Sequence, residues 1–351
     1  MCCVANSQMR QKIKTECLLC GQEASLKRTD VKGYKEPDIF SIYACPHCNT
    51  NFSMPHSLNV TSIYQLIYEN AASIPGYDNY WRFYQEIKKE KNPLRYLASR
   101  NRTYWSVCYA LRKMVSSVKE SPVIFEIGSG LGYLTYALRQ AGYNATGLDI
   151  SEEAVKKAQS DFGDNYVCAD VVEYAREHVK EVDIVVLTEV IEHIEDPIAF
   201  LESLLLLLKD GGSIILTTPN KSYASSSIVW ATDRPPVHCW WFSEESIVFI
   251  AKRLCLSVEF VDFSNCYIER MNPSTPSTSD IEDRHVFLAD GSPFKYTDRI
   301  PQYGIFPRWL KKTGLYKAFS YNVYPLFSAL FSRKTPRCGT MCAVLTKRTS
   351  D

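Results

Sequence analysis

The sequence predicts an α/β protein organised around a doubly wound, mostly parallel sheet. The first observation is Val123–Ile127, a mostly apolar stretch that is typical of a strand buried on both faces. Three glycines at alternate positions follow at once, and Tyr133–Gln140 then shows the apolar spacing of a helix. The second observation is that strand-like and helix-like segments keep alternating downstream, which is the signature of such a sheet.

The three glycines form the turn between this strand and this helix. Glycine lets the backbone turn tightly and approach a ligand closely, and a helix start offers free N–H groups. Strand, glycine turn and helix together open a nucleotide-binding unit. The spacing is Glu126-x-Gly128-x-Gly130-x-Gly132, so it differs from the dinucleotide fingerprint, whose third glycine would replace Tyr133.

A second acidic residue, Asp149, ends the next predicted strand, where a carboxylate can accept both hydroxyls of a ribose. At these positions the sequence resembles the class I S-adenosylmethionine (SAM) dependent methyltransferases, whose first motif is E/D-x-G-x-G-x-G and whose second motif is acidic. The resemblance implies a seven-stranded, Rossmann-like sheet with SAM as cofactor. It also implies that the SAM-binding residues are Glu126, Gly128, Ser129, Gly130, Gly132, Asp149, Ile150, Asp170, Val171 and Glu189.

The resemblance assigns these residues distinct roles. The backbone of Gly128–Gly130 would lie against the methionine part and the ribose, and Glu126 would order the loop or meet the amino group. Asp149 would take the ribose diol. Asp170, after the third predicted strand, would accept from the adenine amino group with Val171 beside it, although a helix cap explains Asp170 equally well.

The remaining elements follow in alternation. Ser151 is expected to cap a helix with two glutamates in its first turn, Asp196-Pro197 to start a second, and Ser243 to cap a third. Further strands are expected at 166–169, 182–190, 213–218, 256–263 and 339–347. In the methyltransferase fold the last two strands pair antiparallel, so residues 264–337 would be an insertion beside the substrate mouth.

The segment Glu189-Val190-Ile191-Glu192-His193-Ile194-Glu195-Asp196-Pro197 follows the fourth predicted strand. It resembles the E-V-x-E-H-x-x-D-P signature of ubiquinone-biosynthesis O-methyltransferases and many bacterial small-molecule and sugar methyltransferases. In that signature His193 would be a base or an orienting residue, and the alternative is a structural hydrogen bond that closes the loop.

His238 is the preferred general base, and His193 is the second candidate. His238 is flanked by aromatic residues that would keep it neutral, whereas the carboxylates near His193 would favour its charged form. Trp240 and Trp241 would either wall a ring-shaped substrate or belong to the core.

Four N-terminal cysteines form two C-x-x-C knuckles separated by 24 residues, and each knuckle presents two sulfurs at one turn. The spacing predicts a structural zinc ribbon with two strands between the knuckles, rather than a redox site or unrelated buried thiols. Gly21 and Asn49 suit the tight turns after the knuckles, and His47 is expected to be a bystander. The predicted ligands are Cys17, Cys20, Cys45 and Cys48.

The amino-acid composition limits the kinds of partner that the protein is expected to have. The net charge is +1, so no global field favours nucleic acid or membrane, and no apolar stretch is long enough to span a bilayer. Thirteen cysteines in a chain of 351 residues indicate a reducing, cytoplasmic compartment rather than a disulfide framework. From Pro301 onward there are nine basic residues and one acidic residue. The basic, aromatic insertion could meet a phosphate or diphosphate, and the alternative is a solvated lid.

The expected organisation is a zinc ribbon at 1–60, a helical lid or linker at 61–121, a SAM-binding core at 122–263, a substrate cap at 264–337, and a final strand and tail at 338–351. The expected function is methyl transfer to a small-molecule acceptor, first of all a hydroxyl of a sugar or secondary metabolite. Two alternatives stay open: an RNA methyltransferase that uses the ribbon and the basic C-terminal region, and a non-catalytic scaffold. Thr217-Thr218-Pro219-Asn220 lacks the N-P-P-Y motif of many base N-methyltransferases.

Overall fold

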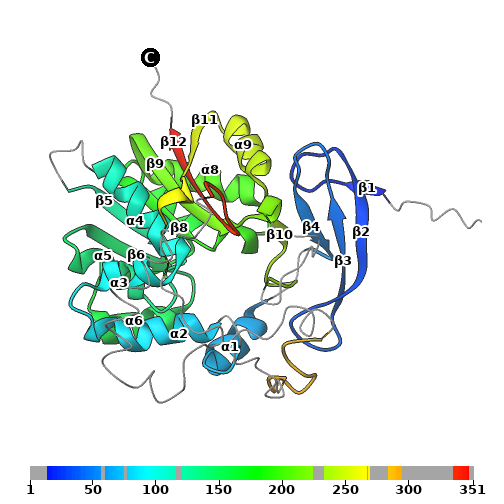
Figure 1. Cartoon of the computed structure of the whole chain (residues 1–351), viewed down its shortest axis with the longest axis horizontal. Helices are drawn as coiled ribbons and strands as arrows, with labels where there is room; N and C mark the ends of the chain where they lie inside the picture. Colours follow the sequence, from blue (N-terminus) through cyan, green and yellow to red (C-terminus); the bar gives the residue numbers. More distant parts are fainter. Residues whose placement is uncertain are drawn as a thin grey trace, which may run out of the picture.

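The structure is a computed structural model that describes residues 14–56, 60–74, 77–115, 121–223, 233–266, 268, 284–294 and 335–347. Two sheets organise the chain, one of seven strands and one of five. Figure 1 shows the seven-stranded sheet within its helices and the smaller sheet at the side of this core. Among the described residues, no helix is both long and apolar enough to cross a bilayer.

The seven-stranded sheet has the order β11-β12-β9-β8-β5-β6-β7. β12 pairs antiparallel with both β9 and β11, and the other neighbours are parallel. The predicted fold class, with its antiparallel last strand, is therefore confirmed. The strands are β5 (Val123–Ile127), β6 (Asn144–Asp149), β7 (Tyr166–Cys168), β8 (Val182–Thr188), β9 (Leu208–Pro219), β11 (Leu256–Phe260) and β12 (Thr340–Lys347).

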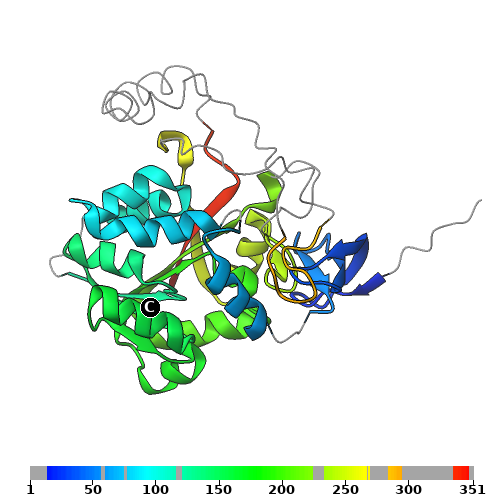
Figure 2. The same cartoon turned by 90° about the horizontal axis from the view of Figure 1, so that it is seen from below.

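Helices cover both faces of this sheet, as Figure 2 shows edge-on. Apolar side chains of α2 to α5 pack on one face, those of α7 to α9 pack on the other, and α6 lies beside α5. The helices are α2 (Tyr77–Glu86), α3 (Pro93–Arg100), α4 (Arg102–Val115), α5 (Tyr133–Gln140), α6 (Glu152–Phe162), α7 (Val171–Glu177), α8 (Pro197–Leu207) and α9 (Glu244–Arg253).

The predicted caps of three helices are in place. Ser151 accepts a hydrogen bond at the start of α6, Asp196 accepts two at the start of α8, and Ser243 forms a reciprocal capping box at the start of α9. Several strand boundaries differ from the prediction, since β8 ends at Thr188 and β11 at Phe260, and the largest difference is at β9. Asp210 and the two glycines after it lie inside β9, so the strand begins directly after α8 at Leu208.

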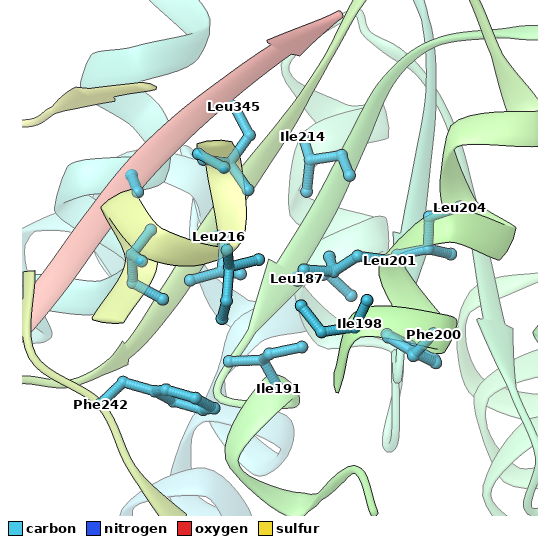
Figure 3. Packing of buried hydrophobic residues seen from close by; sticks show 14 of the residues in the cluster. Leu187, Ile191, Ile198, Phe200, Leu201, Leu204, Ile214, Leu216, Phe242 and Leu345 are labelled. Atoms are coloured by element: carbon cyan, nitrogen blue, oxygen red, sulfur yellow. The ribbon is translucent and has the colours of Figure 1, made fainter. Parts of the chain in front are cut away.

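The core between the sheet and α8 consists of large apolar side chains, most of them from these two elements. Figure 3 shows them interdigitated, and the labelled members are Leu187, Ile191, Ile198, Phe200, Leu201, Leu204, Ile214, Leu216, Phe242 and Leu345. Burying each such side chain stabilises the fold by about 1.5–3 kcal/mol. This packing fixes the carboxyl end of β8, which is followed by residues 189–196, called the acidic loop below.

The smaller sheet, called the ribbon below, has the order β1-β2-β3-β4-β10. Its first four strands come from the N-terminal region and are β1 (Lys14–Glu16), β2 (Glu23–Lys32), β3 (Ile39–Ala44) and β4 (Asn51–Met54). The fifth, β10 (Trp240–Trp241), comes from the segment just before α9 and pairs antiparallel with β4. Two strands lie between the knuckles, as predicted.

β10 also joins the ribbon to the core. Trp240 is fully buried against Phe52 of β4 and Phe242, while Trp241 packs among ribbon residues. The two tryptophans therefore belong to the core and do not wall a substrate, which answers the alternative left open by the sequence. One continuous apolar cluster contains both the ribbon cysteines and the sheet, so the cysteine end of the ribbon shares its core with the sheet, beside the small cluster around Trp241.

Two further segments lie beside the ribbon. Helix α1 (Thr61–Asn70) precedes α2, and its residues Ile63 and Ile67 pack in a small cluster with Tyr34 of the ribbon and Phe287. Residues 284–294, which belong to the predicted substrate cap, dock on the ribbon through hydrogen bonds from the amides of Val286 and Phe287 to the carbonyl of Tyr34. Most of the predicted cap lies outside the described residues.

Candidate functional site

The glycine turn adopts backbone geometry that requires glycine. Gly128, Gly130 and Gly132 have φ values of 73°, 49° and 78°. A Cβ on Gly128 would stand 2.7 Å from Val190, and one on Gly132 would stand 2.6 Å from the Cβ of Ala158. The turn therefore packs closely between the acidic loop and α6, with no room for a side chain at Gly128 or Gly132.

Asp149 fixes this turn from the end of the neighbouring strand. Its Oδ2 accepts a hydrogen bond from the amide of Gly130 at 2.7 Å, and its Oδ1 accepts one from the amide of Ser151 at 2.9 Å. Burial raises the pKa of the carboxyl, and the amide hydrogen bonds oppose that shift. Each oxygen keeps a further lone pair, so the group can still accept ribose hydroxyls as predicted.

Glu126 lies beneath the turn, on β5. Its carboxylate is buried and accepts a hydrogen bond from the Thr135 hydroxyl at the start of α5. Burial raises the pKa of Glu126 to about 8, so much of it is protonated at neutral pH. Two roles were predicted for Glu126, namely to order the loop or to meet the amino group of SAM. This placement accords with the first. The buried hydroxyl of Ser129 has no hydrogen-bond partner among the described residues.

The residues expected around adenine lie at the ends of β6 and β7. Ile150 is 73% exposed, and Val171 is buried at the start of α7. Asp170 caps α7, because its Oδ1 accepts from the amides of Val172 and Glu173 at 2.7 and 3.3 Å. The capping alternative is thus present in the structure, and the contact with adenine stays a prediction.

A second group of side chains follows β8, in the acidic loop and the 3₁₀ turn η2 (Ile191–His193). Glu189 has a φ of 55°, accepts a hydrogen bond from Thr103 at 3.3 Å, and has its pKa raised to about 7 by burial. Glu192 is 1% exposed and accepts from the Thr218 hydroxyl at 2.9 Å. Burial, reinforced by the charge of Glu189, raises the pKa of Glu192 well above its usual range.

The two candidate histidines lie in contact with each other. Their ring centroids are 4.4 Å apart in an edge-on arrangement. The Nδ1 of His193 lies 2.7 Å from the carbonyl of Val237, so this nitrogen carries the proton and Nε2 keeps its lone pair. The Nε2 of His238 lies 3.9 Å from Asp233. The sequence presented the two histidines as alternative candidates for the general base, whereas the fold places them side by side in one site.

The predicted difference in their protonation is wrong. Burial lowers the pKa of both His193 and His238 to about 3, and for His193 the neighbouring His238 lowers it further. Desolvation outweighs the carboxylates near His193 because Glu192 is buried with it and itself holds a proton readily. Both rings are neutral at physiological pH.

These three side chains can hold a cation. Each of Glu192, His193 and His238 offers one ligand atom, and these three atoms lie within 4.8 Å of one another. Glu192 Oε1 and His238 Nδ1 are buried without a hydrogen-bond partner among the described residues. Two neutral imidazoles and a carboxylate are a donor set that divalent transition metals accept. The carbonyl that holds His193 Nδ1 is a typical support for a metal-binding imidazole.

Tyrosines from α1 and α2 face this group and were not named as site residues from the sequence. The Tyr64 ring lies edge-on to His193 at 6.3 Å between centroids. The Tyr77 hydroxyl receives a hydrogen bond from the Tyr34 hydroxyl of the ribbon at 3.3 Å. Burial raises the pKa of Tyr80 well above its usual range, and Glu189 adds to that shift. The sequence predicted only a helical lid or linker over residues 61–121.

The four ribbon cysteines lie close together at the end of the ribbon. The sulfurs of Cys17 and Cys48 are 3.7 Å apart, and those of Cys20 and Cys45 are 3.5 Å apart. Four sulfurs placed tetrahedrally at the usual zinc–sulfur distance would be about 3.8 Å apart. Gly21 and Asn49 have positive φ values of 72° and 52°, as the knuckle turns require. The donor set therefore fits a structural zinc ion.

Residues 99–256 match the family model described as a methyltransferase domain. The chain is 32% identical over 111 residues to the ubiquinone biosynthesis O-methyltransferase of Hydrogenovibrio crunogenus, a match that covers 30% of this chain and 46% of that protein. It is 33% identical over 104 residues to the protein of the same name from Bordetella avium, with 28% and 43% covered. The chain thus spans less than half the length of these curated relatives.

Among solved structures, a SAM dependent methyltransferase from Archaeoglobus fulgidus is similar, with 20% identity and a TM-score of 0.41 over 69% of this chain and 93% of that chain. The family match and the strand order agree on the central part of the chain. Residues 99–256 form a methyltransferase domain of the class I SAM-dependent type.

Proposed function

We propose that this chain transfers a methyl group from SAM to a hydroxyl of a small-molecule acceptor. The observation that carries the proposal is the pairing of two sites at the carboxyl ends of adjacent strands. The glycine turn follows β5 and Asp149 ends β6, and the group of Glu192, His193 and His238 lies beyond β8, which pairs with β5. Ligands of open α/β sheets bind at this edge.

The donor site uses the residues that the sequence named. The backbone of Gly128–Gly130 would lie along the methionine part and the ribose, and Asp149 would accept the ribose hydroxyls. SAM, when bound, supplies a methyl group on a positively charged sulfur, so the protein mainly has to hold the acceptor in line with it. Such positioning can contribute about 7–11 kcal/mol to the lowering of the barrier.

The acceptor site activates the hydroxyl. A hydroxyl attacks poorly unless its proton leaves during the transfer, and His238 is the group proposed to act there. A base with a pKa of about 3 removes a proton weakly, but a neutral imidazole of that pKa still binds a metal. We therefore favour a divalent cation held by Glu192, His193 and His238, which would make the acceptor hydroxyl more acidic. Direct proton removal by His238 is the alternative.

The acceptor class follows from the same surroundings. Tyr64, Tyr77 and Tyr80 give the site aromatic faces and hydroxyl groups, which suit a ring that carries hydroxyls, such as a sugar or a phenolic metabolite. The names of the curated relatives support O-methylation. A phosphate on the acceptor would suit the basic C-terminal region, most of which lies outside the described residues.

The test is a screen of hydroxylated acceptors with SAM, with mass spectrometry used to detect the gain of one methyl group together with S-adenosylhomocysteine. Free sugars, nucleotide-linked sugars and phenols form the panel, each with and without a divalent cation. The proposal predicts a methylated product and its loss with a chelator that spares the ribbon zinc. Methylation of RNA instead, with an affinity that falls steeply with salt, would favour the RNA reading. SAM binding without transfer to any acceptor would favour the scaffold.

A further inference from the structure

The segment that carries His238 is held on one side by the ribbon. Directly after His238, the carbonyl of Cys239 accepts a hydrogen bond from the amide of Ser53 in β4 at 3.0 Å. The next two residues form β10 and pair with β4, Trp240 opposite Phe52 and Trp241 opposite Asn51. The backbone directly after His238 is therefore paired with the ribbon sheet rather than with the core sheet.

The same segment holds the acidic loop on its other side. The amide of Cys239 donates to the carbonyl of Glu192 at 3.0 Å, and the indole N–H of Trp240 donates to the carbonyl of Ile194 at 2.7 Å. His193 Nδ1 donates in turn to the carbonyl of Val237. Residues 237–240 thus lie between the ribbon and the loop, with hydrogen bonds to both.

A lysine docks the second knuckle on the core. The ammonium of Lys221 donates to the carbonyl of Asn49 at 2.7 Å, to the Oδ1 of Asn49 at 2.9 Å and to the Oδ1 of Asn51 at 3.1 Å. The Ser246 hydroxyl at the start of α9 donates to the same carbonyl at 2.9 Å. Lys221 follows β9, the strand whose Thr218 holds the carboxylate of Glu192.

We propose that the ribbon is a positioning element for the acceptor site, and that Lys221 is the residue that locks it in place. The inference rests on the proposed function in one respect, namely that Glu192, His193 and His238 serve the acceptor. The donor site is held differently, because Asp149 bonds to Gly130 and Ser151 within the core. Loosening the ribbon should therefore disturb the acceptor side and spare SAM binding.

Hydrogen exchange measured by mass spectrometry on the full-length protein tests this without any acceptor. In Lys221→Met, peptides that cover residues 190–195 and 237–241 should exchange about tenfold faster or more, the factor expected for losing a hydrogen bond to a charged group. Peptides that cover 123–132 and 144–151 should be unchanged, and zinc content should stay at the wild-type value. Lys221→Arg should restore most of the protection.

Two further variants supply a second test and a control. Asn51→Ala removes one of the three acceptors of Lys221 and should produce a smaller change in the same peptides, so the test survives if Lys221→Met does not fold. Lys180→Met removes an exposed ion pair with Asp210 and should leave both sets of peptides at wild-type rates. SAM affinity, measured by calorimetry, should stay within about twofold of wild type in all four variants.

The outcomes separate the inference from the proposed function. Unchanged exchange at 190–195 in Lys221→Met, or equally faster exchange at 123–132 and 144–151, would overturn the positioning role. With an acceptor from the screen, kcat should fall while the SAM affinity is kept, and an unchanged kcat would also overturn it. Faster exchange confined to the acceptor side, in a protein that methylates nothing in the screen, would uphold the coupling and remove the proposed function.

Discussion

Replacement of Asp149 by alanine tests the donor site most sharply. In the structure this carboxylate already accepts two backbone amides, at 2.7 and 2.9 Å, and so holds the glycine turn against β6. We propose that its remaining lone pairs accept the two ribose hydroxyls of SAM. Asp149→Ala removes both acceptors and the anchor of the turn, whereas the apolar core around β6 is untouched.

The magnitude follows from the number of bonds. Hydrogen bonds to a charged group contribute about 1.5–3 kcal/mol each. Two such bonds to the ribose give about 3–6 kcal/mol, which corresponds to a loss in SAM affinity of about 10²- to 10⁴-fold. Asp149→Asn keeps one oxygen and the shape of the side chain, so its loss should be smaller.

Isothermal titration calorimetry with SAM and with S-adenosylhomocysteine measures the affinities, and thermal unfolding checks that the fold is intact. Asp262→Asn is the matched control, because Asp262 caps the turn after β11, at the far edge of the sheet from β6, and the amide oxygen can still accept from the amide of Ser264. An Asp149→Ala protein that binds SAM with wild-type affinity would remove the ribose assignment. An equal loss in Asp262→Asn would show that the effect is not specific to the ribose contact.

Three further variants test packing, metal and pH. Gly132→Ala places a Cβ 2.6 Å from that of Ala158 at a φ of 78° and should destabilise the fold by about 2–5 kcal/mol in urea unfolding, more than Gly142→Ala, whose Cβ at a φ of 90° meets nothing within 4 Å. Elemental analysis should find one zinc per chain. Cys45→Ser should lose it and lower the melting temperature of the whole chain in one transition, because ribbon and sheet share a core, and a separate early ribbon transition would contradict this. Glu126 has a pKa raised from 4.5 to about 8, so its stabilisation is complete below pH 4.5 and is lost as pH rises towards 8. The stability of Glu126→Gln relative to wild type should therefore increase from pH 5 to pH 8, and parallel pH profiles would refute the buried, protonated state.

The sequence was sufficient where the signal is local. The strand, glycine turn and helix at residues 123–140 follow from spacing within one βα unit, and the structure has β5 and α5 at the expected residues. The cysteine knuckles are equally local, because two sulfurs on one turn already define half of a tetrahedral site. Helix starts at Ser151, Asp196 and Ser243 depend on a side chain and the amides of the next turn.

The sequence was insufficient where distant segments meet. Trp240 and Trp241 read equally well as substrate wall or core, since nothing local shows that they pair with β4, almost two hundred residues earlier. The contact between His193 and His238, and the burial that lowers the pKa of both, also arise only from this long-range packing. Counting nearby carboxylates in the sequence therefore predicted the wrong charge for His193.

The most direct test of the account is the methyl-transfer rate of His238→Ala on an acceptor found in the screen, with SAM affinity measured in parallel. His238→Ala removes a ligand of the proposed cation and the alternative base at once, and loss of proton removal alone should lower the rate about 10²- to 10⁴-fold. His178→Ala is the matched control, because that ring is stacked on Tyr174 at the end of α7, away from the acidic loop. The account predicts a large loss of rate in His238→Ala alone with SAM affinity near wild type, and full turnover in His238→Ala would contradict it.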